Sequence, residues 1–196
     1  MHYIAHRVNT IQELLNTPTE YGVEIDLRDY QDKIILQHDP FKDGECFEEY
    51  LKNYNHGTMI LNIKSEGIEP TVLKLIKKYN VSNYFFLDCS FPMINLLNSK
   101  GERNIALRFS EFEGIDTLYS MAGKVDWVWV DCFTKLPLDA SEADELRDIF
   151  EFKLCFVSPE LQGRNSDREI LDFKENLIRY KIKGDAVCTK RPDLWL

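Results

Sequence analysis

Short apolar runs alternate with segments of helical period along the whole chain, and this alternation constrains the fold more than any other feature. Between the runs, apolar residues recur at i, i+3, i+4 and i+7, as they do at Phe47, Tyr50, Leu51 and Tyr54. Strict strand–helix alternation is typical of a parallel sheet, and eight such units can close into a barrel. The sequence therefore predicts an α/β fold, a compact (β/α)8 TIM barrel of one domain over residues 1–196. The strand-like runs cover residues 3–6, 23–27, 59–63, 84–87, 105–107, 127–130, 153–157 and 186–188.

The second strand carries an extension. Residues 22–30 are followed by a turn at Gln31-Asp32 and by a second apolar run over residues 33–37, which predicts a β-hairpin that delivers His38 to the barrel rim. At 196 residues the chain lies near the lower size limit of this barrel, and an open doubly wound sheet remains the alternative.

Polar residues follow the apolar runs in chain order. Active sites of (β/α)8 barrels lie at the carboxyl ends of the strands, so these residues are expected to share one polar rim. They are His6 with Arg7, Asp26, Lys64, Asp88, Arg108 with Glu111, Asp131, Glu160 and Lys190.

Glu24 and Asp26 form a carboxylate pair on the second strand. Successive odd or even positions of a strand share a face, so both side chains point the same way. Two neighbouring carboxylates repel unless a cation lies between them, and oxygen ligands favour Mg²⁺ or Ca²⁺. The alternative is a buried ion cluster in which Lys64 or Arg7 neutralises the pair, at a cost in desolvation. We expect a metal site.

Two histidines complete a catalytic set. His6 and His38 both end strands beside the carboxylate pair, and imidazoles can donate and accept protons near neutral pH. Asp39 can orient the ring of His38. Lys64 can neutralise a phosphate oxygen as charge develops, or form a salt bridge with the carboxylates. A cation, two imidazoles and a lysine are what metal-assisted cleavage of a phosphodiester requires.

Charge and cysteine content narrow the partners and the compartment. The formal net charge of −9, from 24 basic and 33 acidic residues, disfavours nucleic acid and leaves a small anionic phosphodiester as the expected substrate. Five cysteines without a C-x-x-C pair indicate a reducing compartment. No apolar run approaches the ~18 residues of a membrane span, and no leader pattern opens the chain, so we expect a cytoplasmic protein outside the membrane.

The order of these motifs resembles the glycerophosphodiester phosphodiesterase-like (PLC-like phosphodiesterase) superfamily, which includes the sphingomyelinase D toxins. The family pattern runs His-Arg, Glu-x-Asp, His-Asp and acidic-x-Lys, matched here by His6-Arg7, Glu24-Ile-Asp26 and His38-Asp39, and in part by Asn62-Ile-Lys64. The resemblance implies a Mg²⁺- or Ca²⁺-dependent barrel enzyme in which one histidine activates the nucleophile and the other protonates the leaving alkoxide. Taking the residues and the resemblance together, we expect catalysis by His6 and His38, metal binding by Glu24, Asp26 and Asn62, and phosphate or substrate binding by Arg7, Lys64, Asp88, Arg108, Glu111, Asp131, Glu160 and Lys190.

The chain departs from the family pattern at two places. Asn62 stands where the family usually has a metal-binding carboxylate, which removes one negative charge from the site, and Asp88 is a candidate to compensate. Only residues 41–45 separate Pro40 from the second helix, so the loop that usually shapes the leaving-group pocket is nearly absent. Two alternatives therefore stay open: a phosphate-binding barrel module without efficient catalysis, and a lyase-type transfer that releases a cyclic phosphate.

Four segments resemble a bacterial branch of the superfamily that is associated with surface-polysaccharide gene clusters. This resemblance extends the likeness over the whole chain and implies a substrate that is glycerophosphodiester-like or linked to a glycan or a nucleotide. The segments are residues 61–67, 86–90, 108–111 and 157–161.

Overall fold

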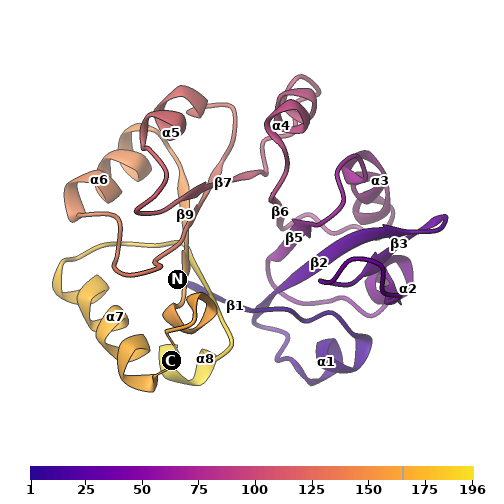
Figure 1. Cartoon of the computed structure of the whole chain (residues 1–196), viewed down its shortest axis with the longest axis horizontal. Coiled ribbons are helices and arrows are strands. Elements are labelled where there is room, and N and C mark those ends of the chain that lie inside the picture. The colour runs from indigo at the N-terminus through magenta and orange to yellow at the C-terminus, as the bar shows by residue number, and fades with distance from the viewer. Residues whose placement is uncertain (165) are drawn as a thin grey trace.

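The computed structural model describes residues 1–164 and 166–196, which form ten strands and eight α-helices. Helices lie around the strands at the centre of the molecule, and one pair of strands projects to its right-hand edge (Figure 1). A π-helical turn, Glu145–Ile149, extends α6, and a 3-10 turn, Pro159–Gln162, follows β9. The elements are β1 (His2–Ala5), α1 (Ile11–Asn16), β2 (Gly22–Tyr30), β3 (Lys33–Leu36), β4 (Glu45–Cys46), α2 (Phe47–Leu51), β5 (Met59–Ile63), α3 (Glu69–Lys78), β6 (Tyr84–Leu87), α4 (Phe91–Asn98), β7 (Ala106–Phe109), α5 (Asp116–Met121), β8 (Trp127–Val130), α6 (Ala140–Asp144), β9 (Lys153–Val157), α7 (Asp167–Arg179), β10 (Ala186–Thr189) and α8 (Pro192–Trp195).

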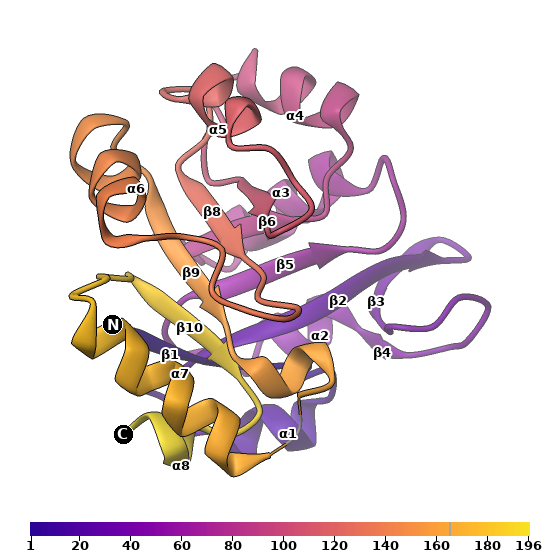
Figure 2. The same ribbon diagram turned by 60° about the vertical axis from the view of Figure 1, so that its left-hand side comes forward.

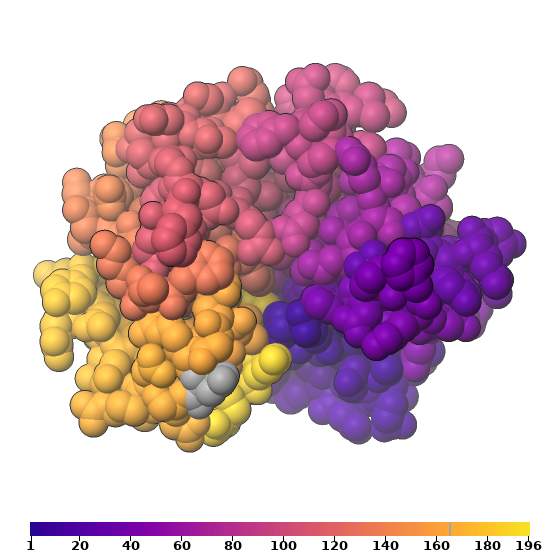
Figure 3. All heavy atoms as spheres, in the orientation of Figure 1, coloured from indigo at the N-terminus to yellow at the C-terminus, as the bar shows by residue number. Residues whose placement is uncertain are grey.

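Eight of these strands are parallel and neighbour one another in chain order. β1 pairs with β2, β2 with β5, and β5 with β6, while β7, β8, β9 and β10 form a second run. β10 pairs with β1, so the first and last strands lie side by side (Figure 2). On the surface, indigo spheres of the N-terminal part of the chain lie beside yellow spheres of its C-terminal part (Figure 3). The order contains no reversal, unlike the open doubly wound sheet that the sequence left as the alternative.

The contact between β6 and β7 is the weakest of the parallel contacts. It consists of one parallel bridge between Phe86 and Ile105, with a 2.8 Å hydrogen bond from the Phe86 N–H to the Asn104 carbonyl. The ladder of β7 with β8 starts at Ala106, so the strand predicted over residues 105–107 lies instead at Ala106–Phe109. Side chains must therefore supply much of the connection across this seam.

The extension at the second strand is a hairpin. β3 pairs antiparallel with β2, and Tyr30 lies opposite Lys33 across the two-residue loop Gln31-Asp32. Gln31 has a φ of 55°, the left-handed conformation that such tight turns require. The short strand β4 then pairs with β3 and adds a third antiparallel strand to the extension. The sheet as a whole is mixed, and the fold is α/β.

Apolar residues fill both sides of the parallel strands. On one face of the parallel strands, Trp127 stacks on Phe85 with a 4.4 Å centroid separation, and Trp129 belongs to the same buried cluster. On the other face, strand residues such as Val128 pack against the helices in a second, larger cluster. Because both strand faces are buried, a charged side chain is tolerated there only at a strand end or beside a group that pairs with its charge. None of the helices in residues 1–164 and 166–196 is both long and apolar enough to cross a bilayer.

Candidate active site

A polar cavity of about 260 Å³ opens at the carboxyl ends of the strands. Its lining brings together residues from β1, β2, β5, β7, β8, β9 and the loops after them, which are far apart in sequence. Eight of the residues predicted from sequence line it: His6, Arg7, Glu24, His38, Asn62, Lys64, Arg108 and Asp131. The sequence analysis missed five others: Trp129, Phe133, Val157, Leu161 and Gln162.

Two residues at this rim have left-handed backbone conformations. Arg7, directly after His6, has a φ of 56°, and Asp88, directly after β6, has a φ of 63°. For non-glycine residues this conformation costs roughly 1–2 kcal/mol, and it persists where the surrounding contacts hold it. At Arg7 the contact is a 2.8 Å hydrogen bond from its backbone N–H to Oε2 of Glu24. The turn after β1 therefore ties His6 and Arg7 to the carboxylate pair.

Glu24 and Asp26 are fully buried on one face of β2, as the strand period predicts. Glu24 Oε1 accepts a 2.8 Å hydrogen bond from Nδ2 of Asn62. Asp26 Oδ2 accepts a 2.8 Å hydrogen bond from Nδ2 of Asn9, whose Oδ1 in turn accepts the Asp26 backbone N–H at 2.9 Å. Burial, reinforced by the neighbouring Asp26 carboxylate, raises the pKa of Glu24 to about 7. When both are ionised, the two buried carboxylates repel each other, and a cation bound between them would offset this repulsion.

Two buried oxygens at this point accept no hydrogen bond within the described residues: Oδ1 of Asp26 and Oδ1 of Asn62. They lie on adjacent strands at paired positions of the β2–β5 register. Together with Glu24 they form a set of hard oxygen donors, which fits Mg²⁺ or Ca²⁺. Asn62 would be the third member of this set, because the described residues contain no group of three His, Cys, Asp or Glu side chains that could hold a metal ion. Lys64 Nζ lies 3.6 Å from Asp26 Oδ1 and places a positive charge beside this oxygen.

The two histidines that line the polar cavity have different surroundings. His6 Nε2 lies 3.8 Å from Oε2 of Glu24, and burial, followed by the charges of Arg7 and Lys190, lowers the pKa of His6 to about 3. Its imidazole is therefore neutral at pH 7 and can accept a proton. His38 is more exposed, and its Nδ1 lies 2.9 Å from Oδ1 of Asp39, the carboxylate that the sequence suggested as its orienting group.

Arg28 fixes the loop that carries His38. Its guanidinium donates to the His38 carbonyl from Nε at 3.1 Å and from Nη2 at 2.8 Å, and to the Lys64 carbonyl from Nη1 at 2.9 Å. The sequence analysis did not single out Arg28 or Asn9. Arg28 could have been predicted, because it lies two positions after Asp26 on the same strand and so shares a face with Glu24 and Asp26.

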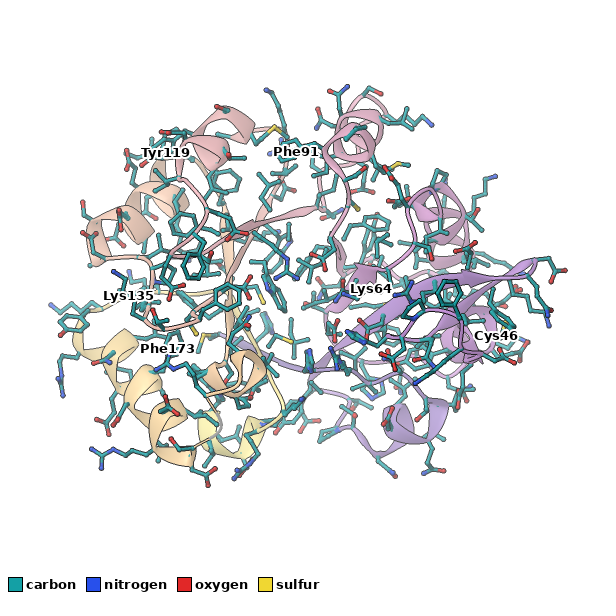
Figure 4. All side chains as sticks on the ribbon, viewed as in Figure 1. Cys46, Lys64, Phe91, Tyr119, Lys135 and Phe173 are labelled. Carbon is teal, nitrogen blue, oxygen red and sulfur yellow. The ribbon has the colours of Figure 1, made fainter. Side chains whose placement is uncertain are left out.

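Charges of alternating sign cross the rim from β2 to β8. Lys64 lies 3.2 Å from Oδ2 of Asp88, and Figure 4 shows it near the centre of the molecule. Arg108 donates to Asp88 from Nε at 2.6 Å and from Nη2 at 3.0 Å, and to Oδ2 of Asp131 from Nη1 at 2.7 Å. The indole N–H of Trp129 donates to Oδ1 of Asp131 at 3.1 Å. Because Asp88 follows β6 and Arg108 lies on β7, these ion pairs bridge the seam between the two strands.

The two aspartates respond to Arg108 to different degrees. Burial works to raise both pKa values, and the Arg108 guanidinium opposes it in both cases. At Asp88, Arg108 and Lys64 together outweigh burial, and the pKa lies below its ordinary value. At Asp131, burial prevails and the pKa lies above it.

Four predicted substrate-binding residues do not line the polar cavity: Asp88, Glu111, Glu160 and Lys190. Asp88 is instead paired with Lys64 and Arg108. The carboxylate of Glu111 accepts hydrogen bonds from the loop at residues 133–135. That of Glu160 accepts from the Thr189 hydroxyl at 2.6 Å and from the Lys190 N–H at 2.9 Å. Lys190 is exposed. Both glutamates follow strands and accept hydrogen bonds from backbone N–H groups of neighbouring loops, so they organise loops around the cavity.

Replacing Glu24 with glutamine is expected to change how stability depends on pH. Folded Glu24 has a pKa of about 7, above its ordinary value of 4.5, so between these pH values the folded state holds a proton that the unfolded state has released. Stability from this group is present below about pH 4.5 and is lost as pH rises to about 7. The Glu24→Gln variant lacks this loss. Its free energy of unfolding, relative to that of wild type, should therefore increase by on the order of 3 kcal/mol between about pH 4.5 and 7, and stay constant at higher pH.

Urea unfolding in EDTA at a series of pH values measures this difference. His6 is present in both proteins, so the pH dependence that it contributes largely cancels. Parallel stability curves for the two proteins would show that Glu24 titrates normally.

Comparison with solved structures identifies the fold. A glycerophosphodiester phosphodiesterase from Agrobacterium tumefaciens str. C58 superposes with a TM-score of 0.68 at 12% identity, covering 100% of this chain and 97% of that one. A glycerophosphoryl diester phosphodiesterase from Parabacteroides distasonis gives 0.66 at 14% identity, covering 98% and 84%. A phosphodiesterase from Oleispira antarctica, in complex with the product sn-glycerol-3-phosphate, gives 0.65 at 16% identity, covering 98% and 94%. No family model and no curated protein sequence matches the chain. The chain therefore has a fold similar to that of the glycerophosphodiester phosphodiesterases, and the prediction of an α/β fold is confirmed.

Proposed function

We propose that this protein is a divalent-metal-dependent phosphodiesterase that cleaves a small anionic phosphodiester in a closed (β/α)8 barrel. The observation that carries the proposal is the polar cavity, where two imidazoles and three cationic side chains lie beside buried oxygens that accept no hydrogen bond within the described residues. The shared fold supports it, since relatives of this fold are phosphodiesterases and one was solved with sn-glycerol-3-phosphate as its product.

The metal ligands in this proposal are Glu24, Asp26 and Asn62, and the ion is Mg²⁺ or Ca²⁺. When bound, such an ion supplies positive charge that neutralises a phosphate oxygen and lowers the pKa of a coordinated nucleophile. Asn62 provides an uncharged oxygen, so the site has two carboxylates where the family pattern has three acidic positions. The expected consequence is weaker metal binding.

The remaining steps belong to side chains of this chain. Arg7 and Lys64 bind the phosphate oxygens and hold the diester in the cavity. His6, neutral at pH 7, accepts the proton of the attacking hydroxyl as the new P–O bond forms. His38, oriented through Nδ1 by Asp39, donates a proton to the leaving alkoxide as the old P–O bond breaks. Water as the nucleophile yields a phosphomonoester and an alcohol.

Phosphorus NMR of the reaction with a set of phosphodiesters tests this function. We expect a phosphomonoester to form with Mg²⁺ or Ca²⁺ and no turnover in EDTA. A five-membered cyclic phosphate as the final product would indicate a lyase-type transfer to a neighbouring hydroxyl of the substrate. Binding of a phosphodiester without turnover under any metal would indicate a phosphate-binding module instead.

The Asn62→Asp variant sharpens the same test. An added carboxylate should tighten Mg²⁺ binding by calorimetry, on the order of tenfold, because affinity for hard cations rises with ligand charge. Unchanged binding would remove Asn62 from the metal site.

The cytoplasmic location and the link to surface polysaccharides are proposals that follow from the sequence alone.

A further inference from the structure

Two phenylalanines form a contacting pair beside the polar cavity. The rings of Phe112 and Phe133 have centroids 5.7 Å apart and are tilted by 45°. Phe112 is 77% exposed and Phe133 37%, and Phe133 also lines the cavity. Single exposed apolar residues are common on protein surfaces, whereas a contacting aromatic pair at the edge of a polar cavity calls for an explanation.

The loop that carries Phe133 is held in place by Glu111. Its carboxylate accepts the backbone N–H groups of Phe133 at 3.3 Å, Thr134 at 2.6 Å and Lys135 at 2.9 Å, and the Thr134 hydroxyl at 2.8 Å. These hydrogen bonds outweigh burial and lower the pKa of Glu111 to about 2, so the carboxylate stays ionised. Phe133 therefore occupies a preorganised position.

Phe112 is positioned in a similar way from the preceding strand. Its backbone N–H donates to Oγ of Ser110 at 3.1 Å, and the Ser110 hydroxyl in turn donates to the carboxylate of Glu113. The loop after β7 and the loop after β8 thus present their aromatic residues to each other. Glu111 connects the two loops.

The polar cavity has a reacting side and a side with apolar side chains. Residues from the β1, β2 and β5 side, among them His6, Arg7 and Lys64, provide the groups for the phosphate. The β8 and β9 side contributes Phe133, Val157 and Leu161, together with Asp131 and Gln162, whose side chains are hydrogen-bonded to each other. An ester substituent of a phosphate held on the reacting side can extend toward Phe133 and its partner Phe112. The opposite wall is short, since the connection between Pro40 and Cys46 is only residues 41–45.

We propose that Phe112 and Phe133 form a stacking subsite for the leaving group of the phosphodiester, and that this leaving alcohol carries a planar aromatic ring. The inference rests on the proposed function and names the substrate class for that same site. Glu111, the acidic group beside the pair, is engaged with the loop, so it does not bind sugar hydroxyls. Two rings in contact suit one flat ring better than a long acyl chain, which needs an extended groove. On cleavage the bond between phosphorus and the alkoxide oxygen breaks, and the ring-bearing alcohol leaves with the proton donated by His38.

Binding of two non-hydrolysable phosphonates tests the subsite without requiring turnover. The probes are the monomethyl esters of 2-phenylethylphosphonate and 2-cyclohexylethylphosphonate, which carry the same charge and place a flat or a puckered ring at the same distance from phosphorus. By calorimetry with Mg²⁺, wild type should bind the phenyl probe about fivefold more tightly, because aromatic pairs contribute beyond area burial. The Phe133→Leu and Phe112→Leu variants should lose this preference. Tyr180→Leu, which removes an exposed aromatic ring after α7, should keep it.

Equal affinity of wild type for the two probes, binding of neither, or a preference that survives in both phenylalanine variants would overturn the subsite. Failure of hydrolysis by phosphorus NMR, with the ring preference intact, would overturn the phosphodiesterase activity and leave the stacking subsite standing. The two proposals therefore fail in different experiments.

Discussion

Replacing His6 with asparagine is expected to lower kcat/KM for a phosphodiester by about 10³-fold, the usual contribution of a positioned general acid or base. Asparagine keeps a polar side chain in the buried position but cannot accept the proton of the nucleophile. His38→Asn should cause a loss of similar size with an alkyl leaving group. Initial rates at saturating Mg²⁺, measured by product phosphorus NMR, give these values.

The leaving group distinguishes the two histidines. A nitrophenolate ion leaves without protonation, so a nitrophenyl diester should recover most of the activity of His38→Asn and little of that of His6→Asn. His2→Asn is the matched control, because His2 is exposed and does not line the polar cavity. Wild-type rates for both His6→Asn and His38→Asn would rule out the two-histidine mechanism. If the nitrophenyl diester restored the activity of His6→Asn instead, His6 would be the general acid and His38 the general base.

Removal of Arg108 is expected to have the largest effect on stability among the rim residues. Arg108→Met leaves Asp131, whose side chain is 1% exposed, without its cationic partner, and removes the ion pair to Asp88 across the β6–β7 seam. Breaking a buried pair costs about 3–5 kcal/mol, and since the Arg108 side chain is 36% exposed we expect a value near 2–3 kcal/mol. Urea unfolding measures this loss in the free energy of unfolding, provided that its dependence on urea concentration has the same slope in both proteins.

A second substitution separates the lost ion pair from lost packing. In Arg108→Met/Asp131→Asn no unpaired carboxylate is left at that position, so part of the stability should return, and the double-mutant cycle isolates the pair. Arg103→Met is the control, since its ion pair with Asp126 is more exposed, and we expect at most about 1 kcal/mol there. A loss for Arg108→Met no larger than for Arg103→Met would mean that the seam does not depend on these ion pairs.

The order of the elements could be predicted because periodicity is a local property. A run such as residues 127–130 must alternate its faces, and it is observed as β8 at Trp127–Val130. The position of the site at strand ends follows from parallel topology, so His6, Glu24 and Asn62 could be expected on one cavity before any coordinates. The strand boundary was predicted less well at Ile105, where a single backbone bridge stands in place of a ladder of hydrogen bonds.

The roles of the glutamates needed the tertiary structure. Glu111 and Glu160 follow strands just as Asp88 and Asp131 do, and nothing local separates them. Their carboxylates meet backbone N–H groups of neighbouring loops, whereas those of the aspartates meet Arg108. The Phe112–Phe133 pair could not be predicted either, because the two residues are 21 positions apart and lie on different loops, which Glu111 connects.

The amino-acid sequence by itself determined the strand and helix order, the rim on which reactive groups gather, and the pairing of Glu24 with Asp26 on one face. Only the tertiary structure decided which charges neutralise one another, which oxygens stay without a donor, and how far the pKa values of His6 and Glu24 depart from their ordinary values. The physical reason is range: backbone periodicity acts over a few residues, whereas burial and Coulomb interactions depend on distances between strands far apart along the chain.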